Sequence, residues 1–216
     1  MRIGGFIKQS LVDWDGRLCA VIFTRSCNLR CFYCHNPTLV LPNLFHEESD
    51  IDAGDILEYL SRRASFLDGV VITGGEPTVQ SDIAEFIAKI KSMDYAVKLD
   101  TNGSNPDILR SLTRDSLLDF VAMDIKHELD FAKYSSISKG ISRACFEKIL
   151  ESVAILEQKN IPFVFRTTVV PGIHSKESIE RLKRRFPGIL LQNYRSEFET
   201  LKDAVHALHQ MKSQSI

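Results

Sequence analysis

The sequence predicts an α/β protein built on a partial barrel of six parallel strands, preceded by a short hairpin. Short apolar runs, typical of strands buried on both faces, alternate with segments of helical periodicity. Such alternation implies parallel strands with right-handed crossovers. Six units are too few for a closed eight-stranded barrel. An open doubly wound sheet is the alternative topology that the pattern leaves.

The hairpin is expected at the start of the chain. Residues 3–12 and 18–24 form two strand-like runs, and Asp15-Gly16 between them supplies the positive φ angles of a tight two-residue turn. Cys19 lies among apolar neighbours and is interpreted as a small buried hydrophobe. The second run leads directly to Cys27.

The later elements follow as pairs of one helix and one strand. Ile56, Leu57, Leu60 and Ala64 have helical spacing and precede a strand at 70–72. The next pairs are a helix from Ser81 with a strand at 95–99, a helix from Pro106 with a strand at 120–123, a helix carrying Phe146, Ile149, Leu150, Val153 and Leu156 with a strand at 163–165, and a helix at 175–186 with a strand at 189–191. A last helix is expected at 198–211.

Composition favours one domain spanning residues 1–216, because 216 residues with 44% hydrophobic content suffice for a single core. A net charge of -1 with dispersed charges argues against nucleic acid or an anionic membrane as partner. No apolar stretch approaches the ~20 residues of a membrane-spanning helix, and the first residues do not resemble a signal peptide. We therefore expect a cytoplasmic protein.

Three cysteines follow the first parallel strand closely. Cys27, Cys31 and Cys34 are spaced so that their thiols can wrap three corners of a small cluster. Iron-sulfur clusters are usually held by four thiolates. Three thiolates therefore indicate a cluster with one iron open to an exogenous ligand.

Two other uses of these cysteines are disfavoured. A zinc site would need His35 beside Cys34, and adjacent residues do not easily ligate one tetrahedral ion. Disulfides are disfavoured because the clustered cysteines are odd in number and the chain shows no secretory context. The remaining Cys145 falls on the apolar side of a helix and is interpreted as packing.

Polar residues gather where the predicted strands end. In β/α barrels chemistry collects at the carboxyl ends of the strands. After the cysteines, these ends carry Thr73–Thr78, Asp100–Gly103, Asp124–Lys126 and Arg166–Thr168. We expect one shared site.

Each group has a plausible physical role. Gly74 and Gly75 let the backbone approach a ligand, and Glu76 can accept hydrogen bonds from a cationic amino group. Asp100 and Asp124 would be two carboxylates in one pocket, where like charge raises a pKa unless a cation lies between them. Lys126 and a bound metal ion are the available cations.

The motifs CxxxCxYCHNP, GGEPT, LDTNG, MDIK and RTTVVPG, in this order, resemble those of the radical S-adenosylmethionine superfamily. The resemblance is to its glycyl radical enzyme activating family, specifically the compact activators of anaerobic ribonucleoside-triphosphate reductase. It extends from Ile7 to about Tyr194. It implies a 4Fe-4S cluster on the three cysteines, with the open iron bound by the amino and carboxylate groups of S-adenosylmethionine.

The resemblance also implies roles for individual residues. Tyr33 is expected to contact the adenine, and a monovalent cation is possible on Asp100, Thr101 and Asp124, as in activators of formate-lyase type. The expected cofactor-binding residues are Tyr33, Gly74, Gly75, Glu76, Asp100, Asn102, Asp124, Lys126 and Arg166. One departure is that Gln192–Arg195 stands where formate-lyase activators usually have a histidine.

The activity implied is reductive cleavage of S-adenosylmethionine to a 5'-deoxyadenosyl radical, which removes hydrogen from a glycine Cα of a partner enzyme. The implied partner is the large subunit of anaerobic ribonucleotide reductase, and the implied electron donor is flavodoxin or ferredoxin. A formate-lyase-like partner, or a small-molecule enzyme of the 7-carboxy-7-deazaguanine synthase type, is the alternative. A non-catalytic iron-sulfur carrier would leave the GGEP and DTNG motifs without a purpose.

A basic run, Arg181, Lys183, Arg184 and Arg185, follows the fifth predicted parallel strand. Such a run is usually a solvated helix face. A docking surface for an acidic reductant is the alternative.

Overall fold

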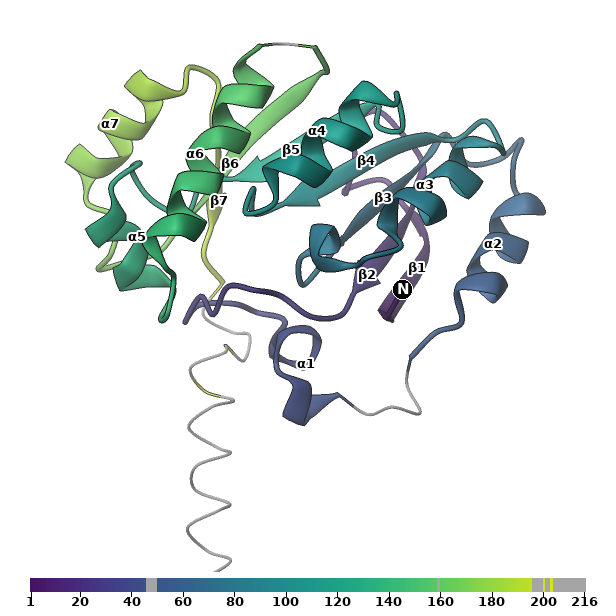
Figure 1. Cartoon of the computed structure of the whole chain (residues 1–216), viewed down its shortest axis with the longest axis horizontal. Coiled ribbons are helices and arrows are strands. Elements are labelled where there is room, and N and C mark those ends of the chain that lie inside the picture. The colour runs from purple at the N-terminus through teal and green to yellow at the C-terminus, as the bar shows by residue number, and fades with distance from the viewer. Residues whose placement is uncertain (46–49, 159, 196–199, 201–202, 204–216) are drawn as a thin grey trace, which may run out of the picture.

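The computed structural model describes residues 1–45, 50–158, 160–195, 200 and 203 (Figure 1). Seven strands form one sheet in the order β1-β2-β3-β4-β5-β6-β7. The strands are β1 (Ile3–Ser10), β2 (Cys19–Thr24), β3 (Gly69–Gly74), β4 (Ala96–Thr101), β5 (Phe120–Asp124), β6 (Phe163–Val169) and β7 (Leu190–Asn193). β1 is antiparallel to β2, and β2 to β7 are parallel.

The strand order distinguishes the two predicted topologies. Each parallel strand pairs with its neighbour in the chain, so the order never reverses as it does in a doubly wound sheet. The predicted α/β fold, with six parallel strands and an N-terminal hairpin, is therefore confirmed, and the doubly wound alternative is wrong. β1 and β7 lie at opposite edges of the sheet, which leaves the barrel open.

Helices cover one face of this sheet. The described helices, in chain order, are α1 (Pro37–Val40), η1 (Pro42–Leu44), α2 (Ala53–Ser61), η3 (Pro77–Val79), α3 (Ile83–Lys91), α4 (Pro106–Arg114), α5 (Phe131–Ile137), α6 (Arg143–Glu157) and α7 (Lys176–Arg185). Figure 1 shows α2, α3, α4, α6 and α7 following one another along the same side of the strands. The apolar residues of these five helices join those of the sheet in the main core.

Successive side chains of β2 point to opposite faces of the sheet. Ala20 and Ile22 belong to the core beneath the helices, whereas Cys19 and Val21 belong to a separate cluster on the concave face. Cys19 is fully buried, and burial raises the pKa of its thiol to about 11. It is a packing residue, as its apolar neighbours in the sequence indicated.

The connection between β1 and β2 corrects the hairpin prediction. Asp15 and Gly16 do form a turn, in which the Arg17 N–H donates to the Trp14 carbonyl at 3.1 Å. The predicted two-residue hairpin is wrong, however, because the chain leaves β1 at Ser10 and inserts Trp14 into the concave core. There the indole packs against Val21, Val71 and Phe120. The longer connection thus buries a large apolar side chain, which favours folding.

Two further expectations concern helices near the C-terminus. The helix predicted at 198–211 falls on residues of which the structure describes only Thr200 and Asp203. On α7, Arg181 pairs with Glu128, Lys183 with Glu180 and Arg185 with Glu157, as expected for a solvated, ion-paired helix face. In the described part of the chain, no helix is both long and apolar enough to cross a membrane.

Candidate active site

One cavity of about 220 Å³ opens at the carboxyl ends of the parallel strands. Every predicted site residue lines it: Cys27, Cys31, Tyr33, Cys34, Gly74, Gly75, Glu76, Asp100, Thr101, Asn102, Asp124, Lys126 and Arg166. Leu29, His35, Asn36, Val40, Thr73 and Thr168 complete the lining. The site is thus shared by the cysteine loop and four neighbouring strands.

The cysteine loop is held against the C-terminal end of α5 and the residue that follows it. The Phe32 N–H donates to the Ile137 carbonyl at 3.1 Å, and Cys31 forms an antiparallel bridge with Ser138. The Ser138 hydroxyl also accepts the Arg30 N–H at 2.8 Å. Sequence reasoning did not identify Ser138, because the contact joins residues far apart in the chain.

The arrangement of the three thiols is the feature on which cluster binding depends. Among the residues that the structure describes, no three His, Cys, Asp or Glu side chains converge as one metal ion requires. Cys27, Cys31 and Cys34 instead lie as free thiols around one cavity. Burial raises the pKa of each, that of Cys27 to about 12, so cluster binding must displace thiol protons.

Gly74, the last residue of β3, and Gly75, the first residue after it, allow close backbone packing. A Cβ on Gly74 would lie 2.4 Å from the Thr24 nitrogen, and one on Gly75 would lie 2.0 Å from the Ser26 oxygen. Gly74 also has φ +116°, which favours glycine. These residues line the cavity as predicted, but the structure shows that they first allow β3 to lie against the start of the cysteine loop.

Glu76 is buried at the join between β3 and β4. Its Oε1 accepts the Thr101 hydroxyl at 2.7 Å and bonds to Thr78, and its Oε2 accepts the Asn102 N–H at 2.7 Å. Burial raises the pKa of Glu76, although these hydrogen bonds oppose the shift. The carboxylate therefore ties the two loops together and keeps Oε2 with capacity for a further donor.

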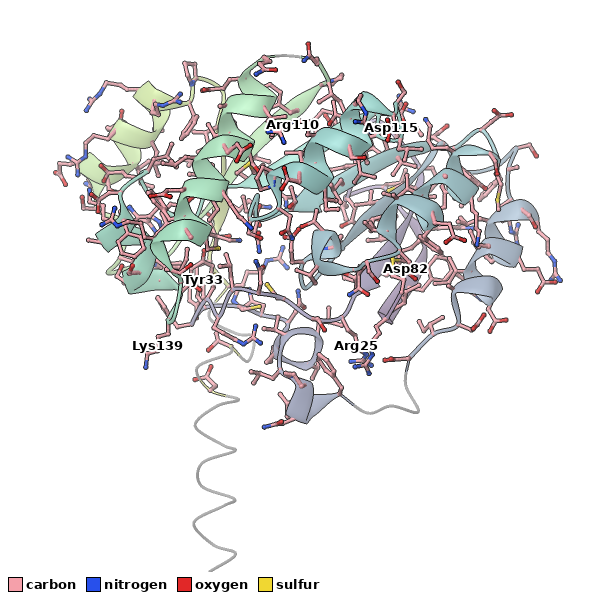
Figure 2. All side chains as sticks on the ribbon, viewed as in Figure 1. Arg25, Tyr33, Asp82, Arg110, Asp115 and Lys139 are labelled. Atoms are coloured by element: carbon pink, nitrogen blue, oxygen red, sulfur yellow. The ribbon has the colours of Figure 1, made fainter. Side chains whose placement is uncertain are left out.

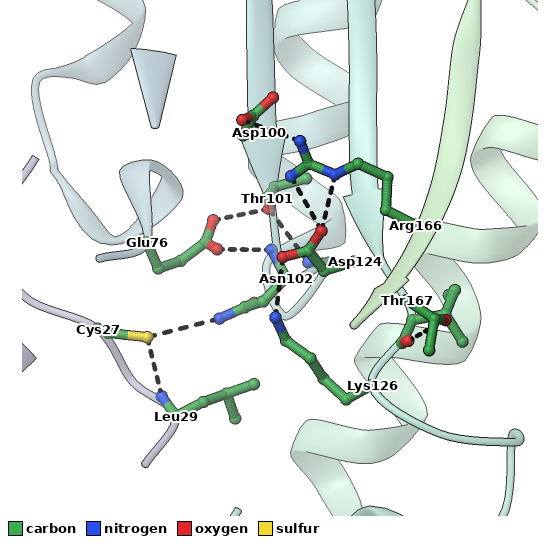
Figure 3. Close-up of polar contacts among 12 residues, drawn as sticks. Cys27, Leu29, Glu76, Asp100, Thr101, Asn102, Asp124, Lys126, Arg166 and Thr167 are labelled. Carbon is green, nitrogen blue, oxygen red and sulfur yellow. Dashed lines mark hydrogen bonds and ion pairs between the residues drawn. The ribbon is translucent and has the colours of Figure 1, made fainter. Parts of the chain in front are cut away.

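Charged side chains alternate across the concave face (Figure 3). Arg166 Nη1 lies 3.2 Å from Asp100 Oδ2, and Arg166 Nε donates to Asp124 Oδ1 at 2.9 Å. Lys126 Nζ donates to Asp124 Oδ2 at 2.9 Å, and Lys98 Nζ lies 3.2 Å from Asp100 Oδ1. The cation between the two predicted carboxylates is thus the Arg166 guanidinium.

This network places Arg166 inside β6, opposite Asp124, and not at the strand's end as the sequence suggested. Burial disfavours the ionised Asp124, but Arg166 and Lys126 outweigh it and lower the pKa of Asp124 to about 2. The hydroxyl of Thr101 donates to Glu76. The predicted cation ligands therefore already have partners within the protein.

Tyr33 offers a buried polar atom to the cavity. It is 6% exposed, and its hydroxyl has no hydrogen-bond partner among the described residues. The ring packs with Leu29, Ile137 and Val170, inward from the cysteine loop (Figure 2). An orphaned buried hydroxyl is a polar atom that a bound ligand could satisfy. The contact of Tyr33 with adenine stays a prediction.

His174 is another residue to which the sequence analysis assigned no role in the site. Its Nδ1 accepts the Val170 N–H at 3.0 Å, so its Nε2 carries the proton and donates to the Lys126 carbonyl at 3.0 Å. Its ring stacks on His127. His174 therefore holds the backbone that presents Lys126 to the cavity.

An open-barrel α/β fold with three thiols and a polar cavity at the strand ends defines a cluster-binding enzyme class. A model of the Radical SAM superfamily matches residues 21–186. The chain belongs to this superfamily, whose members bind S-adenosylmethionine and a 4Fe-4S cluster.

Relatives within the superfamily differ in activity. A Methanocaldococcus jannaschii protein named "Putative glycyl-radical enzyme activating enzyme" is 32% identical over 84% of this chain and 74% of its own length. The pyruvate formate-lyase-activating enzyme of Clostridium pasteurianum is 30% identical over 84% of this chain and 74% of its own length. A "Probable GTP 3',8-cyclase" of Pyrococcus horikoshii is 28% identical, and the chain spans only 55% of its length.

Solved structures share the fold at low identity. TYW1 with a lysine-pyruvate adduct has a TM-score of 0.60 and 18% identity, covering 91% of this chain and 73% of that one. SuiB of Streptococcus suis bound to S-adenosylmethionine has a TM-score of 0.61 and 17% identity, covering 91% and 47%. These similarities support the fold and do not specify a substrate.

Replacing Glu76 with glutamine tests whether its carboxylate binds the methionyl amine. We expect Glu76→Gln to retain iron and to lose ~1.5 to 3 kcal/mol of S-adenosylmethionine binding, because a charged acceptor is lost. Anaerobic calorimetric titration measures the affinity. If the affinity is unchanged and only the free energy of unfolding falls, Glu76 does not bind the amine, and its role is to hold together the loops after β3 and β4.

Proposed function

We propose that this protein is an activase that installs a glycyl radical on a partner enzyme, the large subunit of anaerobic ribonucleoside-triphosphate reductase. The similarity over 84% of the chain to proteins named as activating enzymes carries the activase part of this proposal. The choice of the reductase as partner rests on the motif resemblance described above. The Cys34-His35-Asn36-Pro37 and Val169–Gly172 motifs, which resemble those of activases, also support it.

The chain's own residues have defined tasks in this activity. The thiolates of Cys27, Cys31 and Cys34 would hold the cluster, leaving one iron open to S-adenosylmethionine. When bound, these groups supply one-electron reduction and a radical able to take a hydrogen atom from glycine Cα. We assign Lys126 to the methionyl carboxylate, because its Nζ bonds to one aspartate, Asp124, whereas Arg166 is shared between two. The open sheet edges leave space for a peptide loop.

The proposal includes flavodoxin or ferredoxin as the electron donor. We also propose that a monovalent cation binds beside Asp100, Thr101 and Asp124. Such an ion must displace Arg166 from between the two carboxylates or bind to oxygen atoms that Arg166 leaves free. Because Arg166, Lys126 and Lys98 already pair with the two carboxylates, the ion would add positive charge to a site that is already compensated.

The decisive experiment is electron paramagnetic resonance of the reduced activase mixed with the reductase large subunit and S-adenosylmethionine. We expect a doublet, because the unpaired electron on Cα couples to the single remaining α-hydrogen. Replacing the partner's radical-site glycine with alanine should abolish the doublet.

Other substrates separate the alternatives in the same assay. A doublet that appears only with a formate-lyase-like partner would show that the assigned partner is wrong and that the activase class is right. Turnover of GTP or a small purine precursor without any protein radical would overturn the activase proposal.

A further inference from the structure

Asn102 lines the cavity and directs its amide nitrogen toward a cysteine sulfur. Its Nδ2 lies 3.8 Å from Cys27 Sγ, within hydrogen-bond reach of sulfur, and 3.1 Å from Asn28 Oδ1 (Figure 3). Asn102 is 6% exposed. Because an amide nitrogen has two N–H groups, both donors of Asn102 are committed within the protein.

The neighbouring contacts fix which way the amide points. Asn102 Oδ1 accepts the Ser104 N–H at 2.9 Å, and Asn28 Nδ2 donates to the Ser104 hydroxyl at 2.7 Å. A flipped amide would place its oxygen against Asn28 Oδ1 and its nitrogen against the Ser104 N–H. The orientation that directs N–H toward Cys27 is therefore the one that satisfies every partner.

We propose that Asn102 is a positioning residue that donates a hydrogen bond to the Cys27 thiolate and thereby raises the reduction potential of the cluster. This assigns Asn102 to the cluster rather than to S-adenosylmethionine. The proposal depends on the superfamily's cluster and not on the substrate.

The physical basis is the charge added on reduction. One electron from an external low-potential reductant increases the negative charge shared by the cluster and its thiolates. An N–H dipole aimed at a sulfur stabilises that charge, and hydrogen bonds to sulfur are among the factors that set cluster potentials. The Leu29 N–H, 3.4 Å from the same sulfur, is a backbone contribution that side-chain substitution leaves in place.

Asn102→Asp removes the donor with little change in shape, and Asn102→Ala removes it without adding charge. Asn105→Asp is the matched control, because Asn105 lies three residues away and its amide donates to Thr78. Each protein is reconstituted anaerobically without S-adenosylmethionine. Its midpoint potential is then measured by dithionite titration, followed by electron paramagnetic resonance.

We expect both Asn102 variants to keep the wild-type iron content. Their equilibrium constant for one-electron reduction should fall about tenfold, a shift of about 59 mV to more negative potential. The Asn105 control should shift clearly less than Asn102→Asp. An unchanged potential in both Asn102 variants overturns the proposal, and weaker S-adenosylmethionine binding would then assign Asn102 to that ligand. A folded chain that assembles no cluster in either variant would also overturn it, since Asn102 would then serve assembly.

Discussion

Cys31→Ala should abolish cluster binding, lowering iron from about four atoms per chain to near zero. Two thiolates cannot hold a cluster that already lacks a fourth protein ligand. Formation of 5'-deoxyadenosine from S-adenosylmethionine should fall below detection. The sheet should remain folded, because Cys31 packs with a small group of apolar side chains around the cysteine loop and lies outside the main core. Anaerobic reconstitution with colorimetric iron analysis measures the loss.

Cys145→Ala is the matched control for this experiment. Cys145 lies on α6 and packs at the periphery of the same small group of apolar side chains, but it does not line the cavity. It should keep the full iron content. Wild-type protein that binds one zinc and no iron would contradict the cluster assignment.

Arg166→Ala should lower the free energy of unfolding by about 3 to 5 kcal/mol, the range for removing one partner from a buried ion pair. Arg166 is largely buried, and its guanidinium bonds to Asp100 and Asp124. Without it the two carboxylates face each other, compensated only by the lysines at their outer oxygens. Anaerobic urea unfolding at neutral pH measures the change.

The exposed Arg110 provides a matched control for Arg166. It also bridges two carboxylates, those of Asp107 and Glu151, but on the outer surface of α4 (Figure 2). Solvent screens such pairs, so Arg110→Ala should destabilise the protein much less. Equal effects of the two substitutions would contradict a special role for the concave network.

The pH dependence provides a second test of the same network. Asp124 has a folded-state pKa of about 2, below its ordinary value of 3.8. Its contribution to stability is therefore present above pH 3.8 and lost as the pH falls toward 2. Arg166→Ala should flatten this part of the wild-type profile.

Much of this arrangement can be predicted from the sequence, because its determinants are local. Apolar runs such as 70–72 and 120–123 predict buried parallel strands, and polar residues immediately after them must share one edge of the sheet. The cysteine spacing predicts a cluster loop for the same reason. Resemblance to a known family then suggests roles for residues that the spacing alone leaves unassigned.

Tertiary structure decided which of these side chains contact one another. Asp124 faces Arg166 because β5 and β6 pair in that register, and strand register depends on packing across the whole sheet. Asn102 reaches Cys27 because two loops, separated by some 75 residues, fold onto the same edge. The insertion of Trp14 into the concave core depends on neighbours from β2, β3 and β5. Local periodicity contains no information about such non-local contacts, so the sequence determined the fold and the site's composition, while three-dimensional packing determined its charge pairing and its hydrogen bonds to sulfur.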